Sequence, residues 1–389
     1  MRRRNAESIL QAVRQQPGLS RADVARVCDL AKSTVSSVVD ELVKSELVDE
    51  TGSKESSRGR RPVGLMFNPN SRVAVGLSLD HNRLVIVLCN LDGIVQAVRT
   101  KKLTRRNNLQ SVASIVLPEL QRLLADQDLV PSKIAGAGLA VPGPLPSVPA
   151  ACTEGDKLNY ESLRKQLARE LKCSVVIDSN TNMAALAESR LGAARDCEEA
   201  LVVRLGQEVR SALIVDHKLL KGAQGRAGEL GHVKAPGIER ACKCGKRGCI
   251  NSVAATDAIL SRCQSSGAQF DDIDEVISSA IGGDRHCREA LIDAGLAVGY
   301  GIAICINILA PPHLILTGRL VAAGNLLLDP LREAITKFAT TDNLLNCNLV
   351  FDDSHNHIEA IGASLASLSE DDFLLNLISE SSAKAIQEA

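Results

Sequence analysis

The N-terminal part of the chain carries apolar residues at the spacing of short α-helices. Ile9, Leu10 and Val13 lie on one stripe of a first helix, and the breakers Pro17 and Gly18 end it. Because apolar residues three and four positions apart share one face of a helix, this stripe is expected to face a small core.

A second helix is predicted over residues 20–30. Ser20 and Asp23 form a variant capping box, and Val24 and Val27 are expected to face the core. A third, amphipathic helix begins at residue 32, because four apolar residues recur at i, i+3, i+4 and i+7. These residues are Val35, Val38, Val39 and Leu42.

The polar face of the third helix begins with five residues: Lys32, Ser33, Thr34, Ser36 and Ser37. Short polar side chains of this kind can reach base edges and phosphates. A polar loop, 52–62, follows at the spacing of a wing, and its arginines Arg58, Arg60 and Arg61 suit a minor groove. Residues 1–70 are therefore predicted to form a winged helix-turn-helix domain that binds double-stranded DNA. A three-helix module that binds a protein is the alternative.

From Arg72 onward, short β-branched strands alternate with helices. Strands are predicted over 73–79, 84–89, 94–99 and 134–141, with a helix over 109–126, and strands recur over 200–206, 211–216 and 313–318. This alternation predicts an α/β fold of two similar lobes, 71–190 and 191–370, with ligands bound beyond the strand ends. A tail, 371–389, is expected to be helical with an acidic start, or a frayed end.

The composition is that of a globular protein, with 45% hydrophobic and 23% charged residues and a formal net charge of −1. Nucleic-acid binding therefore depends on a local basic patch. No apolar run approaches the ~20 residues that span a bilayer, and the N-terminus lacks a signal-peptide pattern, so no membrane partner and a cytoplasmic location are expected. With no Trp, two Tyr and five Phe, sugar recognition would rest on hydrogen bonds.

Three of the twelve cysteines are closely grouped: Cys242, Cys244 and Cys249. Together with His232 they supply the four ligands of a closed tetrahedral zinc site, which indicates a structural Zn²⁺. Packing cysteines without a metal are the alternative. Those are usually buried among apolar residues, whereas these three lie among lysines, an arginine and glycines.

Four further motifs complete the pattern: LAVPGP at 139–144, GELGH at 228–232, CKCGKRGC at 242–249 and INILAPPHLILTG at 306–318. With the winged helix they resemble the ROK family of bacterial repressors and sugar kinases, over nearly the whole chain, and most of all its repressor branch. The resemblance implies an actin-like, hexokinase-type (ribonuclease H-like) body of two lobes. It also implies a zinc ion that shapes the sugar pocket, and a homo-oligomer, either dimer or tetramer.

Phosphoryl transfer needs glycine-rich turns and a base that accepts the hydroxyl proton. Where kinases of the family carry glycine turns, this chain carries charged side chains: Asp80, Glu208, Arg210 and Arg319. The resemblance places the family's general base at Asn180, whose amide cannot accept a proton. Asp178 is two residues away, and strand-end geometry would aim it differently. We therefore expect no catalytic residue and no enzyme activity.

Five residues match the family's sugar contacts: Ser179, Asn180, Glu229, His232 and Asn251. The expected protein is a repressor of carbohydrate-utilisation genes whose operator affinity responds to a sugar or sugar derivative. The amides at two contacts leave the identity of this effector open. A sugar kinase with residual activity, and a repressor controlled by a protein partner, are the alternatives.

Overall fold

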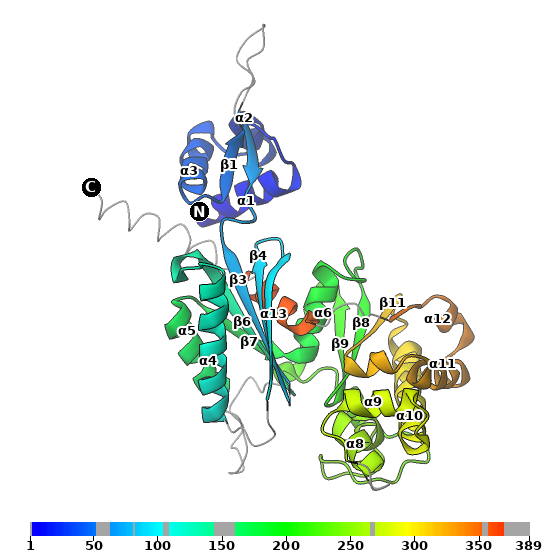
Figure 1. Ribbon diagram of the computed structural model, residues 1–389. Helices are drawn as coiled ribbons and strands as arrows, with labels where there is room; N and C mark the ends of the chain where they lie inside the picture. Colours follow the sequence, from blue (N-terminus) through cyan, green and yellow to red (C-terminus); the bar gives the residue numbers. More distant parts are fainter. Residues whose placement is uncertain are drawn as a thin grey trace.

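The computed structural model describes residues 2–51, 63–80, 82–103, 109–143, 160–264, 269–351 and 357–368. Within them the chain forms a small N-terminal domain and two α/β lobes, each with its own five-stranded sheet (Figure 1). The small domain lies at one end of the first lobe. This arrangement confirms the predicted fold class.

The N-terminal domain has three helices and an antiparallel strand pair: α1 Arg2–Gln15, α2 Arg21–Val27, α3 Lys32–Lys44, β1 Val48–Thr51 and β2 Gly64–Phe67. The predicted capping box is present. The Ser20 hydroxyl accepts a hydrogen bond from the Asp23 backbone N–H, and the Asp23 carboxylate accepts one from the Ser20 backbone N–H. The four predicted apolar residues of α3 are buried. Val27 is 53% exposed, so its predicted place in the core is wrong; α2 ends there, and Val24 fills its inner face.

The predicted wing, with Arg58, Arg60 and Arg61, lies outside the described residues, and so does the predicted tail over 371–389. The strands that would flank the wing, β1 and β2, are present and paired, with Thr51 opposite Gly64. The winged-helix topology predicted from the sequence is therefore present on either side of the loop.

The sheet of the first lobe has the strand order β5-β4-β3-β6-β7. The elements of this lobe are β3 Val73–Asp80, β4 Arg83–Asn90, β5 Val95–Lys102, α4 Leu109–Asp126, β6 Ile134–Val141, α5 Tyr160–Leu171, β7 Val175–Ser179, α6 Asn180–Arg190 and α13 Ile358–Leu368. Side chains alternate along β4: Leu84 and Ile86 pack with α4 and α5, while Val85 and Val87 pack with α6 and α13.

Helix α13 packs directly against the backbone of the first sheet. A β-carbon added at Gly138 of β6 would lie 1.9 Å from the Ala363 carbonyl oxygen, and one at Gly76 of β3 would lie 1.9 Å from that of Ala360. Only glycine permits this approach. The helix falls within the range 191–370 expected for the second lobe, yet it packs on the first.

The second sheet has the order β10-β9-β8-β11-β12, so both sheets place their strands in the same relative sequence. Its strands are β8 Ala200–Leu205, β9 Val209–Val215, β10 Lys218–Leu220, β11 His313–Thr317 and β12 Asn348–Phe351. The helices of this lobe are α7 Asn251–Ala254, α8 Thr256–Gln264, α9 Ile273–Ile281, α10 Arg285–Leu309, α11 Asn325–Phe338 and α12 Thr341–Leu345. This repetition is the pair of similar lobes predicted from the strand pattern.

Among the described residues, α10 alone is long and apolar enough, by length and composition, to cross a membrane. The expectation that no segment approaches this length is wrong for α10: its first turns are charged, but beyond Asp293 the helix carries no charged residue up to its end at Leu309. Some 56% of its apolar window is buried, and the helix packs along α11. Its apolar character therefore serves the core of the second lobe.

Candidate functional site

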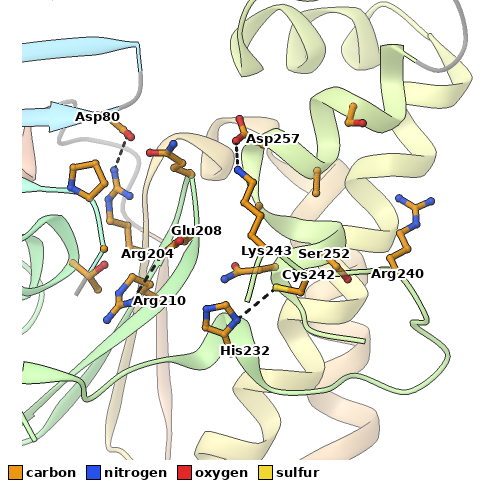
Figure 2. Close-up of a pocket in the computed structure, with 18 of the residues that line it drawn as sticks. Asp80, Arg204, Glu208, Arg210, His232, Arg240, Cys242, Lys243, Ser252 and Asp257 are labelled. Atoms are coloured by element: carbon orange, nitrogen blue, oxygen red, sulfur yellow. Dashed lines mark hydrogen bonds and ion pairs between the residues drawn. The ribbon is translucent and has the colours of Figure 1, made fainter. Parts of the chain in front are cut away.

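A cavity of about 670 Å³ lies between the two lobes (Figure 2). Asp80, at the end of β3, and Asn180, at the start of α6, line it from the first lobe. Arg204, Arg210 and His232 line it from the second. The strand ends of both lobes therefore open into one crevice, where ligands of α/β proteins bind.

Three of the five predicted sugar contacts line the cavity: Asn180, His232 and Asn251. The Asn180 amide donates to the Leu79 carbonyl at 2.9 Å, while its buried Oδ1 has no hydrogen-bond partner in the described structure. An unmet acceptor at a cavity wall is suited to a ligand hydroxyl. The Asn251 Oδ1 accepts from the Val209 N–H at 2.7 Å, so that side chain also holds the cavity wall.

The other two predicted contacts, Ser179 and Glu229, are not among the described residues that line the cavity. The Ser179 hydroxyl caps α6 by accepting from the Asn182 N–H. Glu229 lies between Arg210 and His232, with its carboxylate 2.9 Å from the Arg210 Nη1 and 3.7 Å from the His232 Nε2. Ser179 is thus engaged in helix capping, and Glu229 is engaged with two residues that line the cavity.

Arg204 is a residue of the site that the sequence reasoning missed. It is 7% exposed and pairs with two carboxylates, with Nη2 3.0 Å from Asp80 Oδ2 and Nε 2.7 Å from Glu359 Oε1. Burial alone would lower the pKa of Arg204, but the charges of Glu359 and Asp80 outweigh it and raise that pKa. A lone arginine in the apolar strand ALVVRL was the available signal.

Charged side chains stand where a nucleotide-binding site would need open backbone. Asp80, Glu208 and Arg210 all border the cavity, and Arg319, which pairs with Asp274, lines a smaller adjoining pocket that shares Asp80. Because phosphates need glycine turns or unpaired cations, paired arginines and an added carboxylate are a poor cradle.

Asp178 does not replace the missing base. One oxygen of its carboxylate accepts from the Ser179 N–H and the Asn182 side chain, both at 2.7 Å. The other lies 2.9 Å from Lys221 Nζ. The carboxylate is therefore held by its own turn and by Lys221 of the second lobe, and Asp178 is not among the described residues that line the cavity.

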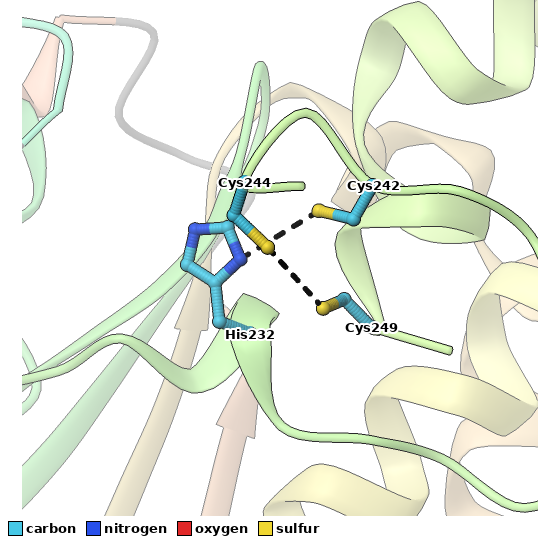
Figure 3. A group of neighbouring side chains, drawn as sticks. All are labelled: His232, Cys242, Cys244 and Cys249. Carbon is cyan, nitrogen blue, oxygen red and sulfur yellow. Dashed lines mark hydrogen bonds between the residues drawn. The ribbon is translucent and has the colours of Figure 1, made fainter. Parts of the chain in front are cut away.

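The four predicted metal ligands gather at one point (Figure 3). Their ligand atoms all lie within 4.8 Å of one another, with Cys242 Sγ 3.7 Å from His232 Nδ1 and Cys244 Sγ 3.7 Å from Cys249 Sγ. A tetrahedron with zinc–sulfur bonds of about 2.3 Å has sulfur atoms about 3.8 Å apart. The donor set and its spacing therefore fit a four-coordinate metal.

The surroundings of the cluster also suit a cation. Burial, with the neighbouring thiols, raises the pKa of Cys249 to about 12 in the absence of a metal. A hydrogen bond from the backbone of Lys246 lowers the pKa of Cys244. The Glu229 carboxylate lies beside Nε2 of His232, and Nδ1 of the same ring faces the thiols. At many metal centres a carboxylate supports a histidine ligand in this way.

The predicted DNA-reading residues lie together on the first turns of α3. Lys32, Ser33 and Ser37 are exposed, and Thr34 and Ser36 are half-buried. The apolar face of α3 packs away from them, against α1 and α2. A continuous polar surface at the start of a helix is thus available to a groove.

Comparison with known proteins gives matches over most of the chain. The sequence profile of the ROK family matches residues 76–369, and that of the MarR family matches residues 8–59. The xylose repressor of Caldicellulosiruptor bescii is 28% identical over 344 residues, covering 85% of this chain and 86% of that protein.

Two solved structures show the same fold. A ROK family transcriptional regulator, described as a homologue of the E. coli MLC protein, has a TM-score of 0.77 and 21% identity over 97% of this chain and 99% of that one. A ROK family glucokinase from Streptomyces griseus, in complex with glucose and AMPPNP, has a TM-score of 0.65 and 17% identity. The match covers 77% of this chain and 100% of that one. With the family profile covering three quarters of its length, the chain belongs to the ROK family.

Proposed function

We propose that this protein is a DNA-binding transcriptional repressor whose operator affinity is controlled by a sugar or sugar derivative in the interlobe cavity. The observation that carries this proposal is the combination in one chain of a winged helix with an exposed polar reading face and a kinase-like cavity. The cavity keeps hydrogen-bonding groups, while charged side chains border it and Asn180 stands where the resemblance places the general base. The printed name of the Caldicellulosiruptor bescii relative, a xylose repressor, supports the same function.

The reading face is formed by Lys32, Ser33, Thr34, Ser36 and Ser37. These residues would contact the major groove, and the wing arginines Arg58, Arg60 and Arg61 the minor groove or the phosphates. Two winged helices of a homo-oligomer would bind half-sites about 34–36 Å apart, or a multiple of that, on a pseudo-palindromic operator. Such a regulator acts in the cytoplasm.

Replacing Lys32 with alanine should weaken operator binding and lower the salt dependence of the affinity by about one unit of slope, because one phosphate contact is lost. Titrations at several salt concentrations measure both. Lys44→Ala, at the exposed far end of α3, is the matched control and should leave the slope unchanged. Equal slopes for the two variants would remove Lys32 from the DNA interface.

Sugar phosphorylation is not expected from this protein. With D-glucose, D-xylose or N-acetylglucosamine, a coupled assay for ADP release should find no sugar-dependent ATP turnover, because Asn180 cannot act as the base. Asn180→Asp should not restore turnover either, since the paired side chains of Asp80, Arg204 and Arg210 remain. ADP release in proportion to added sugar would instead assign a kinase function.

The metal that we propose at the cluster is a structural Zn²⁺, held by His232, Cys242, Cys244 and Cys249. Zinc would cross-link the loop 232–249 and supply no open coordination position for chemistry. The loop also provides cavity-lining residues, among them His232 and Arg240, so the metal fixes one wall of the cavity.

The function is tested by binding of the purified protein to its own upstream DNA, at stated salt, with and without a panel of neutral sugars and sugar phosphates. Specific binding that one sugar relieves is the expected result, and binding that a sugar strengthens would make that sugar a co-repressor. Specific binding that no compound alters would assign control to a protein partner. No specific binding would overturn the proposal.

A further inference from the structure

A buried ion pair joins the two lobes across the cavity. Arg204 belongs to β8 of the second lobe, whereas Asp80 ends β3 of the first lobe and Glu359 lies in the first turn of α13. The arginine is 7% exposed, and the carboxylates are 20% and 14% exposed. Taking one partner from such a group leaves a charge without compensation, so the lobes are held strongly at this point.

The other polar contacts between the lobes involve cationic side chains that are more exposed than Arg204 and are therefore weaker. Lys221 of the second lobe lies 2.9 Å from Asp178 of the first, with the lysine side chain 62% exposed. Lys102 of β5 lies 3.2 Å from Asp272, with the lysine side chain 66% exposed. Arg319 donates to the Asn82 side chain at 3.4 Å. Water and salt screen contacts of this kind, so they contribute little to the relative position of the lobes.

The winged helix is fastened to the first lobe by apolar packing. Leu91 and Ala135 of the first lobe are buried in the same cluster as the core of the winged helix, and Leu368, at the end of α13, packs against it. Leu368 and Glu359 are at opposite ends of one helix, and that helix is in backbone contact with β3 and β6. Helix α13 thus runs from the interlobe ion pair to the base of the winged helix.

Ion pairs reinforce this attachment. Arg14 of α1 lies 2.8 Å from Asp92, and Glu46, just after α3, pairs with Lys133 and lies 3.5 Å from Arg72. These contacts anchor the winged helix on two sides of the apolar patch. The winged helix, the first lobe and α13 therefore form one body, and the second lobe, against whose sheet Ala185 of α6 also packs, forms the other.

We propose that Arg204 is an interlobe clamp: it fixes the second lobe relative to a single body made of the winged helix, the first lobe and α13. This inference rests on the proposed function for its biological role. Arg204 and Asp80 both line the cavity, so a bound ligand contacts the clamp directly. In a homo-oligomer whose protomers associate through the second lobe, the angle that the clamp sets between the lobes determines the spacing of the two winged helices.

Distances between spin labels test the clamp without knowledge of the effector. Because the chain has twelve cysteines, the labels are attached to a non-canonical ketone amino acid at exposed positions. These positions are Lys44 in the winged helix, Arg169 in the first lobe and Lys218 in the second. The pair 169–218 reports the interlobe angle, and the pair 44–169 reports the attachment of the winged helix.

Both pairs should give narrow distance distributions in the wild type. Arg204→Gln should broaden the 169–218 distribution and leave the 44–169 distribution narrow, whereas Arg204→Lys should keep much of the wild-type distribution. Arg332→Gln, which breaks an exposed pair with Asp329 in the second lobe, is the control and should change neither. If Arg204→Gln does not fold, Glu359→Gln, which keeps the Arg204–Asp80 contact, should broaden the interlobe distribution partially.

If Arg204→Gln folds and its 169–218 distribution is unchanged, the clamp is overturned. If only Glu359→Gln folds, an unchanged 169–218 distribution in that variant has the same consequence. A broad 44–169 distribution in the wild type would overturn the single body. Operator titration separates this inference from the proposed function. If the wild type binds its operator, Arg204→Gln should change the affinity by about tenfold, in the range of ordinary allosteric coupling. If the wild type binds no DNA, the function fails while the distances still decide the clamp.

Discussion

Replacing Cys249 with serine is expected to release the metal from the second lobe and to lower the stability of that lobe by several kcal/mol. Cys249 is completely buried, and its thiol lies against that of Cys244. A structural zinc ion contributes on the order of 10 kcal/mol to the folding of isolated finger peptides. The loss here should be smaller, because the second lobe has a large apolar core of its own.

The matched control for this variant is Cys263→Ser. Cys263 is equally buried in the same lobe, on α8, and lies outside the cluster of metal ligands. Its replacement places the same hydroxyl group in a core but should keep about one zinc per chain. Metal analysis and thermal unfolding, each with and without a chelator, measure the difference.

A chelator should lower the melting temperature of the wild type and of Cys263→Ser, but not that of Cys249→Ser, which has no metal to lose. A wild-type protein that contains no metal, or equal chelator effects in all three proteins, would contradict the zinc assignment. The four residues would then be packing and loop residues, as in the alternative reading of the sequence.

The features that the sequence predicted correctly are those whose partners are close along the chain. The capping box joins Ser20 and Asp23, three residues apart, and the buried face of α3 follows from a helical repeat. The three cysteines that gather beside His232 fall within eight residues of one another, and the loop that holds them could be recognised by its motif. Local spacing was sufficient for each of these predictions.

The features that the sequence did not predict depend on residues far apart. Arg204 pairs with Asp80 and Glu359, which are 124 and 155 positions away. No local pattern places these three together. Helix α13 returns to the first sheet after the whole second lobe, so a boundary drawn from the order of elements assigns it to the wrong neighbour. The fold alone brings these residues to one place.

Glu229 illustrates the difference between a motif and a geometry. The motif GELGH marked it as a sugar contact, whereas its carboxylate lies between Arg210 and His232. Arg210, in β9, occupies a position where the resemblance implies glycine, and its guanidinium lies 2.9 Å from that carboxylate. The motif by itself does not indicate this ion pair.

Replacing Gly138 with alanine is expected to destabilise the first lobe by about 3 kcal/mol, near the upper end of the usual cost of overpacking. The added β-carbon would lie 1.9 Å from the Ala363 carbonyl oxygen, which is backbone and cannot rotate away. Either α13 or β6 must move. Since α13 carries Glu359 at one end and Leu368 at the other, this movement should also loosen the winged helix.

Gly282→Ala is the matched control, because its added β-carbon would meet nothing closer than 3.3 Å and its backbone is right-handed helical. Both substitutions restrict the unfolded chain equally, so Gly282→Ala should be neutral or stabilising by up to about 1 kcal/mol. The difference between the urea midpoints of the two variants therefore isolates the packing of α13. The rate of amide hydrogen exchange near Leu368 should rise in Gly138→Ala and not in Gly282→Ala. If the two variants have equal urea midpoints and equal exchange rates, α13 is not packed against the sheet as closely as its glycine contacts require.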